Sequence, residues 1–203
     1  MDTPFTTQKR KGSGKMAFFQ DANGREWNLR ITVKAVQDVR EHVQNPETGE
    51  YFDLYEIVET GNFKPLKKLD ILVKTAFWLL YDEIIQEFDF QEFENAREKT
   101  GFYESFPEKK NQTRTQKMFD WFQTGLTGEV LEEMADALSE AIVNFTVSRT
   151  QKEALKEILA SEKELETEAM KLGLEKFRER TARIREKMPE ILEENFQLEP
   201  YEN

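Results

Sequence analysis

The chain has 203 residues, of which 38% are hydrophobic and 34% charged, and its formal net charge is −11. This length allows one domain with a hydrophobic core, or a smaller domain with an appendage. The negative charge disfavours nucleic acid and anionic membranes as main partners, because both require a concentrated positive surface. The sequence contains no cysteine, which excludes disulfides, thiolate metal sites and cysteine nucleophiles and fits a reducing cytoplasm.

Residues 1–15 are polar and basic and lack the apolar core of a signal peptide, so export by that route is not expected. We interpret them as a flexible basic tail, with a basic arm that docks on an acidic partner as the alternative.

Residues 16–33 have the pattern of a β-hairpin. Asp21, Asn23 and Gly24 suit a type I turn followed by a left-handed residue. Every second residue of the expected second strand is apolar, which places one set of side chains on a single face: Trp27, Leu29 and Ile31.

A short helix is expected directly after the hairpin. Thr32 is placed to cap it, and valines recur at helical spacing up to its expected end: Val33, Val36, Val39 and Val43. We expect this helix to lie back over the hairpin. Residues 51–59 fit neither a helical nor a strand period cleanly, and we assign them to a short helix.

The densest run of large apolar side chains is Leu69–Phe88. Apolar residues cover most of its circumference, which indicates a central helix surrounded by other elements. Its charged residues exclude a membrane span: Lys74, Asp82, Glu83 and Glu87.

Residues 82–98 carry many carboxylates and a single Arg97. Carboxylates at helical spacing, such as Glu83 and Glu87, are one way to hold a hard cation. No histidine is nearby and no calcium loop is present, so we expect a solvated helix and no metal site. Residues 99–114 are expected to form a loop whose aromatic side chains either pack back or bind a partner.

A short helix capped by Thr113 or Thr115 follows, and a glycine-containing break at 125–128 separates it from the next helix. Glu129–Phe145 is the cleanest amphipathic pattern in the chain and is expected to pack on the central helix. Ser148 begins a capping box that opens a further helix.

Beyond residue 160 the apolar stripe thins and charged pairs fill the other faces. The stripe consists of Leu165, Met170, Leu174, Phe177, Ile184 and Met188. This pattern indicates either a solvent-exposed arm or a partner-dependent coiled coil. Ser161 could restart a helix after a bend, and residues 190–203 are expected to fray.

The predicted fold is therefore mainly α with a small N-terminal β-hairpin, a compact helical domain and a long charged C-terminal helix. We divide the chain into a basic tail at 1–15, a hairpin and helical domain at 16–160, and a charged helical extension at 161–203.

The sequence offers little catalytic chemistry. His42 is the only histidine and lies near the end of a short helix, where histidine is commonly a surface or capping residue. No phosphate-binding glycine loop or dinucleotide motif is present. We expect no enzymatic activity, no catalytic residue and no cofactor.

Five features follow one another along the chain: an F-x-D-x-x-G-R-x-W hairpin from Phe19 to Trp27, a V-x-A-V-x-x-V helix, the apolar middle helix, Gly125–Gly128 and the helix at 135–145. This order resembles the tail assembly chaperones of tailed bacteriophages. The resemblance covers residues 17–160, with 89–114 as an apparent insertion.

This resemblance implies a non-enzymatic factor in the host bacterial cytoplasm. Such a factor binds the tape measure protein, helps to recruit tail tube subunits and is absent from the finished virion. Homo-oligomerisation stays open. Aromatic side chains of the insertion are the expected client contacts, unless they pack within the loop: Phe90, Phe93, Phe102, Tyr103 and Phe106. The alternatives are a structural tail or connector protein retained in the particle, and a helical adaptor that binds one protein.

Overall fold

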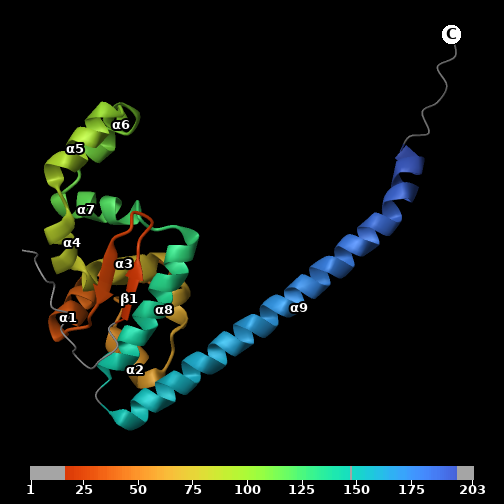
Figure 1. Ribbon diagram of the computed structural model, residues 1–203, viewed down its shortest axis with the longest axis horizontal. Coiled ribbons are helices and arrows are strands. Elements are labelled where there is room, and N and C mark those ends of the chain that lie inside the picture. Colours follow the sequence, from red (N-terminus) through yellow and green to blue (C-terminus); the bar gives the residue numbers. More distant parts are fainter. Residues whose placement is uncertain (1–16, 147, 196–203) are drawn as a thin grey trace, which may run out of the picture. The chain divides into compact units, whose positions relative to one another are not determined.

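The computed structural model describes residues 17–146 and 148–195, with side chains up to residue 184. The basic tail expected at 1–15 lies outside these residues. The chain forms two compact units, which meet in the sequence between Leu155 and Lys156. Figure 1 shows the predicted fold class, mainly helical with a small N-terminal hairpin and a long C-terminal helix.

The hairpin consists of β1 (Ala17–Gln20) and β2 (Glu26–Leu29), which pair antiparallel. Phe19 lies opposite Trp27 in the register, and both are 1% exposed. Gly24 has a φ of 80°, a left-handed conformation that glycine adopts without a Cβ clash. The alternation of buried and exposed residues therefore forms one apolar face with Trp27 and Leu29, as predicted, but β2 ends at Leu29 and Ile31 lies beyond it, partly exposed.

Asp21 fixes the turn of the hairpin. Its carboxylate accepts hydrogen bonds from the backbone N–H groups of Asn23 and Arg25 at 2.9 and 3.0 Å, and from the Trp27 indole at 3.1 Å. The Ala22 N–H also donates to the Gly125 carbonyl at 2.9 Å. This hydrogen bond joins the turn of the hairpin to the chain at Gly125.

The helix after the hairpin is α1 (Val33–His42), and the Thr32 hydroxyl accepts from the Ala35 N–H at its start, as predicted. Two expectations for this helix are wrong. Val33 is 69% exposed and does not join the other valines of the predicted row, Val36, Val39 and Val43, which are all buried. Moreover, α1 packs on the middle helix, and the hairpin is covered by a later helix.

Residues 43–68 contain less regular structure than the helices on either side. Tyr51 forms an isolated bridge with Gln44, so α2 begins only at its N-cap Asp53 and spans Leu54–Thr60. Gly61 ends it in the left-handed conformation. A 3₁₀ helix, η1 (Lys64–Lys67), then leads to the middle helix.

The central apolar run forms two helices, and the prediction of one helix is corrected. They are α3 (Leu69–Leu79) and α4 (Tyr81–Glu87), separated by Leu80 with φ −98° and ψ 5°. Neither proline nor glycine lies at this point, so the pattern holds no sign of the break. Most of α3 is buried, although Leu69 is 56% exposed.

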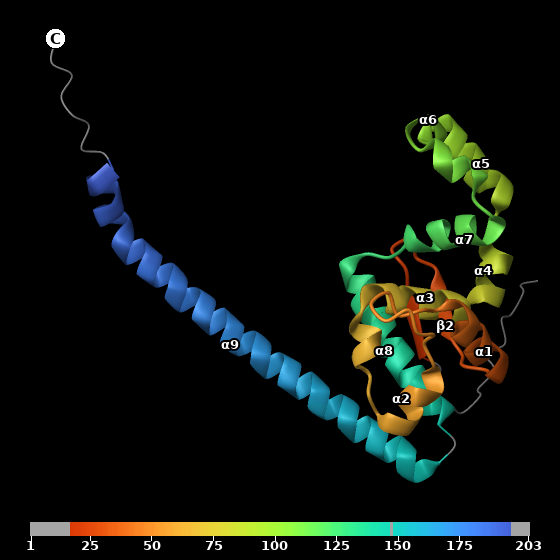
Figure 2. The ribbon, with the colours of Figure 1, turned by 180° about the vertical axis from the view of Figure 1, so that it is seen from behind.

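The helix α8 (Gly128–Phe145) covers the hairpin. Its buried stripe follows the predicted spacing and includes Val130, Met134, Leu138, Ala141 and Ile142. This stripe packs mainly on β1 and also contacts α3 (Figures 1 and 2). The same apolar face therefore closes the core between the hairpin and the middle helix.

The segment between α4 and α8 is helical almost throughout. It comprises α5 (Phe90–Lys99), α6 (Phe102–Ser105), a 3₁₀ helix η2 (Pro107–Asn111) and α7 (Arg114–Gln123). The loop expected at 99–114 is thus wrong, because α6 and η2 fill it with short helical turns. Thr113 caps α7 in a capping box with Gln116.

The last helix, α9 (Arg149–Asn195), is continuous, with no restart at Ser161. The Gln151 N–H donates to the Ser148 hydroxyl at 3.4 Å where α9 begins. Residues 190–195 are helical, against the expected fraying, and 196–203 lie outside the described residues.

Candidate partner-binding surfaces

Residues 90–111, here called the α5–α6 lobe, extend from the body beyond α7 (Figures 1 and 2). None of the residues in α5, α6 and η2 is buried. Phe88, at the end of α4, is 5% exposed and makes edge contacts with Phe93 and Trp121 at centroid distances of 5.2 and 5.4 Å. This contact joins the base of the lobe to α7.

Arg97 is the centre of the lobe. Its guanidinium lies 4.2 Å from the ring centroids of both Phe93 and Phe102, which are cation–π contacts. The same guanidinium forms an ion pair with Asp120 of α7 at 3.0 Å, and Lys109 adds a second at 3.2 Å. One cation therefore joins two aromatic rings to the underlying helix.

The pKa of Asp120 is lowered in this setting. Burial alone acts in the opposite direction, but hydrogen bonds from Arg97, Gln112 and Lys109 outweigh it. The carboxylate is thus stabilised in its charged form, as the ion pairs require.

A second polar cluster ties α5 to α7. The Lys117 ammonium lies 2.9 Å from the Glu94 carboxylate, and the Tyr103 hydroxyl donates to the same carboxylate at 2.9 Å. Burial tends to raise the pKa of Glu94, yet the hydrogen bonds from Lys117 and Tyr103 lower it overall. The lobe is therefore fixed mainly by charged hydrogen bonds, with aromatic rings packed edge-on or tilted between them.

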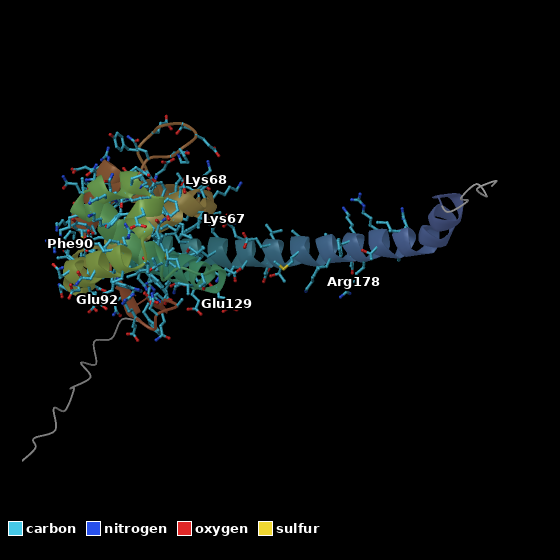
Figure 3. All side chains as sticks on the ribbon, turned by 90° about the horizontal axis from the view of Figure 1, so that it is seen from above. Lys67, Lys68, Phe90, Glu92, Glu129 and Arg178 are labelled. Atoms are coloured by element: carbon cyan, nitrogen blue, oxygen red, sulfur yellow. The ribbon has the colours of Figure 1, made fainter. Side chains whose placement is uncertain are left out.

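The five aromatic residues expected to contact a client divide into two groups. Phe93, Phe102 and Tyr103 are partly covered and belong to the packing of the lobe. Phe90 and Phe106 are 40% and 48% exposed, and Figure 3 labels Phe90 at the surface. Only these last two present large apolar area to a partner.

The residues that fix this surface were not singled out from the sequence. Arg97, Asp120 and Lys117 position the rings, and the one available signal was a lone arginine inside an acidic, aromatic stretch. Such a cation attracts both carboxylates and ring faces.

A longer apolar surface lies on α9. Four side chains recur at intervals of four, three and seven residues and are 69, 52, 68 and 51% exposed, in this order: Met170, Leu174, Phe177 and Ile184. We call this row the α9 seam. The spacing places its members along one side of the helix, in the pattern by which helices pack side by side.

His42 has a packing role. Its ring stacks on Trp78 at a centroid distance of 3.9 Å, and its Nδ1 lies 2.8 Å from the Asp38 carbonyl oxygen. Both rings border an open hollow of 340 Å³ that also includes Phe119 and Lys74. The imidazole is a flat contact surface at the end of α1.

The described part of the chain shows neither a cluster of metal-ligating side chains nor a membrane-spanning helix. Within 17–146 and 148–195, no group of three or more His, Cys, Asp or Glu residues could hold a metal ion. No helix in this part of the chain combines the length and apolar character needed to cross a membrane.

Comparison with known proteins gives no assignment: no protein-family model, curated protein or solved structure matches the chain.

Proposed function

We propose that this chain is a non-enzymatic assembly factor of a tailed bacteriophage that binds the tape measure protein and assists tail tube assembly in the host cytoplasm. The observation that carries the proposal is the α9 seam, where four large apolar side chains are at least half exposed. Rows of this kind on soluble helices commonly mark protein contacts.

A tape measure protein is expected, from the resemblance described above, to be a long helical client with apolar stripes. A helix offering a narrow apolar row can pack along such a stripe and shield it from water. The exposed Phe90 and Phe106 supply a second contact of the same kind on the α5–α6 lobe. The net charge of −11 favours solubility of the factor and of the complex.

The hairpin motif has a structural role within this proposal. Phe19 and Trp27 are buried, and Asp21 and Gly24 form the turn. These residues therefore fix the fold of the body, and client binding in this proposal depends on the exposed surfaces.

Co-expression with the tape measure protein of the same phage tests the proposal. The wild-type chain is expected to keep the tape measure protein soluble and to co-purify with it. Phe177→Asp on the seam should abolish both effects. Leu172→Asp is the matched control, because Leu172 is 57% exposed on the same helix but lies about 140° around it from Phe177.

The main alternative is a structural protein that stays in the particle. Mass spectrometry of purified particles separates the two roles: the assembly factor should be absent, whereas stoichiometric copies would contradict the proposal. If Phe177→Asp and Leu172→Asp reduced co-purification equally, the α9 seam would not be the surface that binds the client.

A further inference from the structure

The charged residues beside the α9 seam are all basic. In heptad notation Leu174 takes position a, and Met170, Phe177 and Ile184 take position d. Between residues 170 and 184 the flanking positions e and g are then occupied by Lys171, Gly173, Arg178 and Arg180. Figure 3 shows the side chain of Arg178 extending from the helix.

The acidic residues of this stretch lie on the opposite side. Glu175 and Glu179 occupy positions b and f, away from the seam. A chain with a net charge of −11 thus presents basic residues and no acidic ones along the two edges of this exposed apolar row.

We propose that the α9 seam binds a helix from another protein that has an apolar stripe edged by Asp and Glu. The inference rests on the proposed function and specifies the chemistry of the client segment. Apolar side chains of that helix would cover Met170, Leu174 and Phe177, while its carboxylates would meet Arg178 and Arg180 across the seam. Charges at e and g select the partner in this way in coiled coils.

A second copy of the chain fits the surface less well. In a parallel pair position g faces e of the partner, and in an antiparallel pair like positions face each other. Either orientation sets Arg178 and Arg180 against basic residues or Gly173, and only the parallel pair brings Lys171 opposite an acidic residue, Glu166. Like charges across a helix pair oppose association.

An anionic membrane also fits less well. Interfacial helices present a broad apolar face to the lipid. Here basic residues border the row closely on both sides, and Thr181 interrupts it at position a. The row has the width of a helix-packing seam.

Two synthetic helical peptides of about four heptads provide the test. Both carry Leu and Ile at a and d, one has Glu at e and g, and the other has Lys there. The like charges keep each peptide from pairing with itself. Fluorescence anisotropy with the full chain is expected to give about tenfold tighter binding of the Glu peptide. General attraction to an acidic protein would favour the Lys peptide, so this preference reports the local surface.

Paired variants locate the effect. Arg178→Glu with Arg180→Glu should reverse the preference. The control Lys176→Glu with Arg183→Glu makes the same change in charge on the other side of α9 and should leave the preference unchanged. Circular dichroism should show equal helix content in both proteins.

Several results would overturn the inference. These are equal binding of the two peptides, tighter binding of the Lys peptide, or equal effects of the two paired variants. Binding to phosphatidylglycerol vesicles in place of the Glu peptide, or a dimer in ultracentrifugation that Phe177→Asp dissociates, would assign the seam to another occupant.

The two proposals fail separately. If the tape measure protein co-purifies but the peptides bind equally, the partner chemistry is wrong and the proposed function stands. If the Glu peptide is preferred but the tape measure protein is not retained, the proposed function is wrong.

Discussion

Replacing Asp21 with asparagine tests how the hairpin is fixed to the rest of the body. The substitution keeps the shape of a side chain that is 2% exposed but turns one of its two acceptor oxygens into an N–H donor group. Asp21 accepts hydrogen bonds through both oxygens. In either orientation the amide NH₂ group of asparagine therefore faces an N–H group that donates to a carboxylate oxygen in the wild-type chain.

The expected loss follows from these contacts. If Oδ1 keeps the two backbone bonds, the Trp27 indole N–H, now 3.1 Å from Oδ2, remains buried without an acceptor, which costs about 2 kcal/mol. The ion pair with Arg25, whose side chain is 34% exposed, adds about 0.5 kcal/mol. Asp21→Asn should thus lower the unfolding free energy by about 2.5 kcal/mol and the Tm by roughly 8 °C.

Urea unfolding followed by tryptophan fluorescence measures this change. Trp27, Trp78 and Trp121 are the three tryptophans of the sequence, and all precede residue 155, so the signal reports the body without α9. Asp82→Asn is the control, because it removes the carboxylate of an ion pair with Lys34 in which both side chains are at least 69% exposed. It should cost no more than about 0.5 kcal/mol.

A double-mutant cycle isolates the hydrogen bond. Trp27→Phe removes the indole donor, so Asp21→Asn should cost about 2 kcal/mol less in that background. Equal stability of Asp21→Asn and Asp82→Asn, or additive effects within the cycle, would refute the assigned role of Asp21.

Two further predictions concern the same body. Gly125→Ala should destabilise it by about 2 kcal/mol, because a Cβ would lie 2.7 Å from the Asp21 carboxylate; Gly128→Ala, with no atom within 4 Å of its Cβ, should be neutral in the same urea assay. The pKa of Asp120 is lowered on folding, so its contribution is complete above the ordinary value of 3.8 and is lost as the pH falls through the lowered folded-state pKa. After correction for intrinsic rates, the amides of α5 should become less protected from hydrogen exchange as the pH falls below 3.8. Asp120→Asn should reduce this pH dependence. The same pH dependence in Asp120→Asn as in the wild-type chain would contradict the role of the ion pair between Arg97 and Asp120.

Local features were predictable because their causes are local. The hairpin turn depends on the φ of Gly24, and α1 depends on the Thr32 cap, so both follow from short stretches of sequence. The stripe of α8 was also clear, since its spacing is regular over eighteen residues.

Packing partners were not predictable in the same way. The pattern gives α1 and α8 an apolar face each, but it does not state which of them covers the hairpin. The structure assigns this place to α8, and α1 packs on α3. The break at Leu80 and the helical turns at 99–114 likewise depend on contacts that no local period encodes.

The candidate surfaces were predictable only in part. An aromatic stretch was recognised, but its division into packed and exposed rings depends on Arg97, which brings Phe93 and Phe102 together through cation–π contacts. The seam on α9 follows from residue spacing alone, because a single long helix fixes the direction of every side chain.

Hydrogen exchange of the full chain with and without the tape measure protein tests the central claim most directly. Binding at the seam should slow exchange of α9 amides between residues 165 and 184 and, to a smaller extent, of the α5–α6 lobe, while the buried hairpin changes little. Unchanged exchange along α9 in a complex that has formed would contradict the account, because the client would then be bound elsewhere.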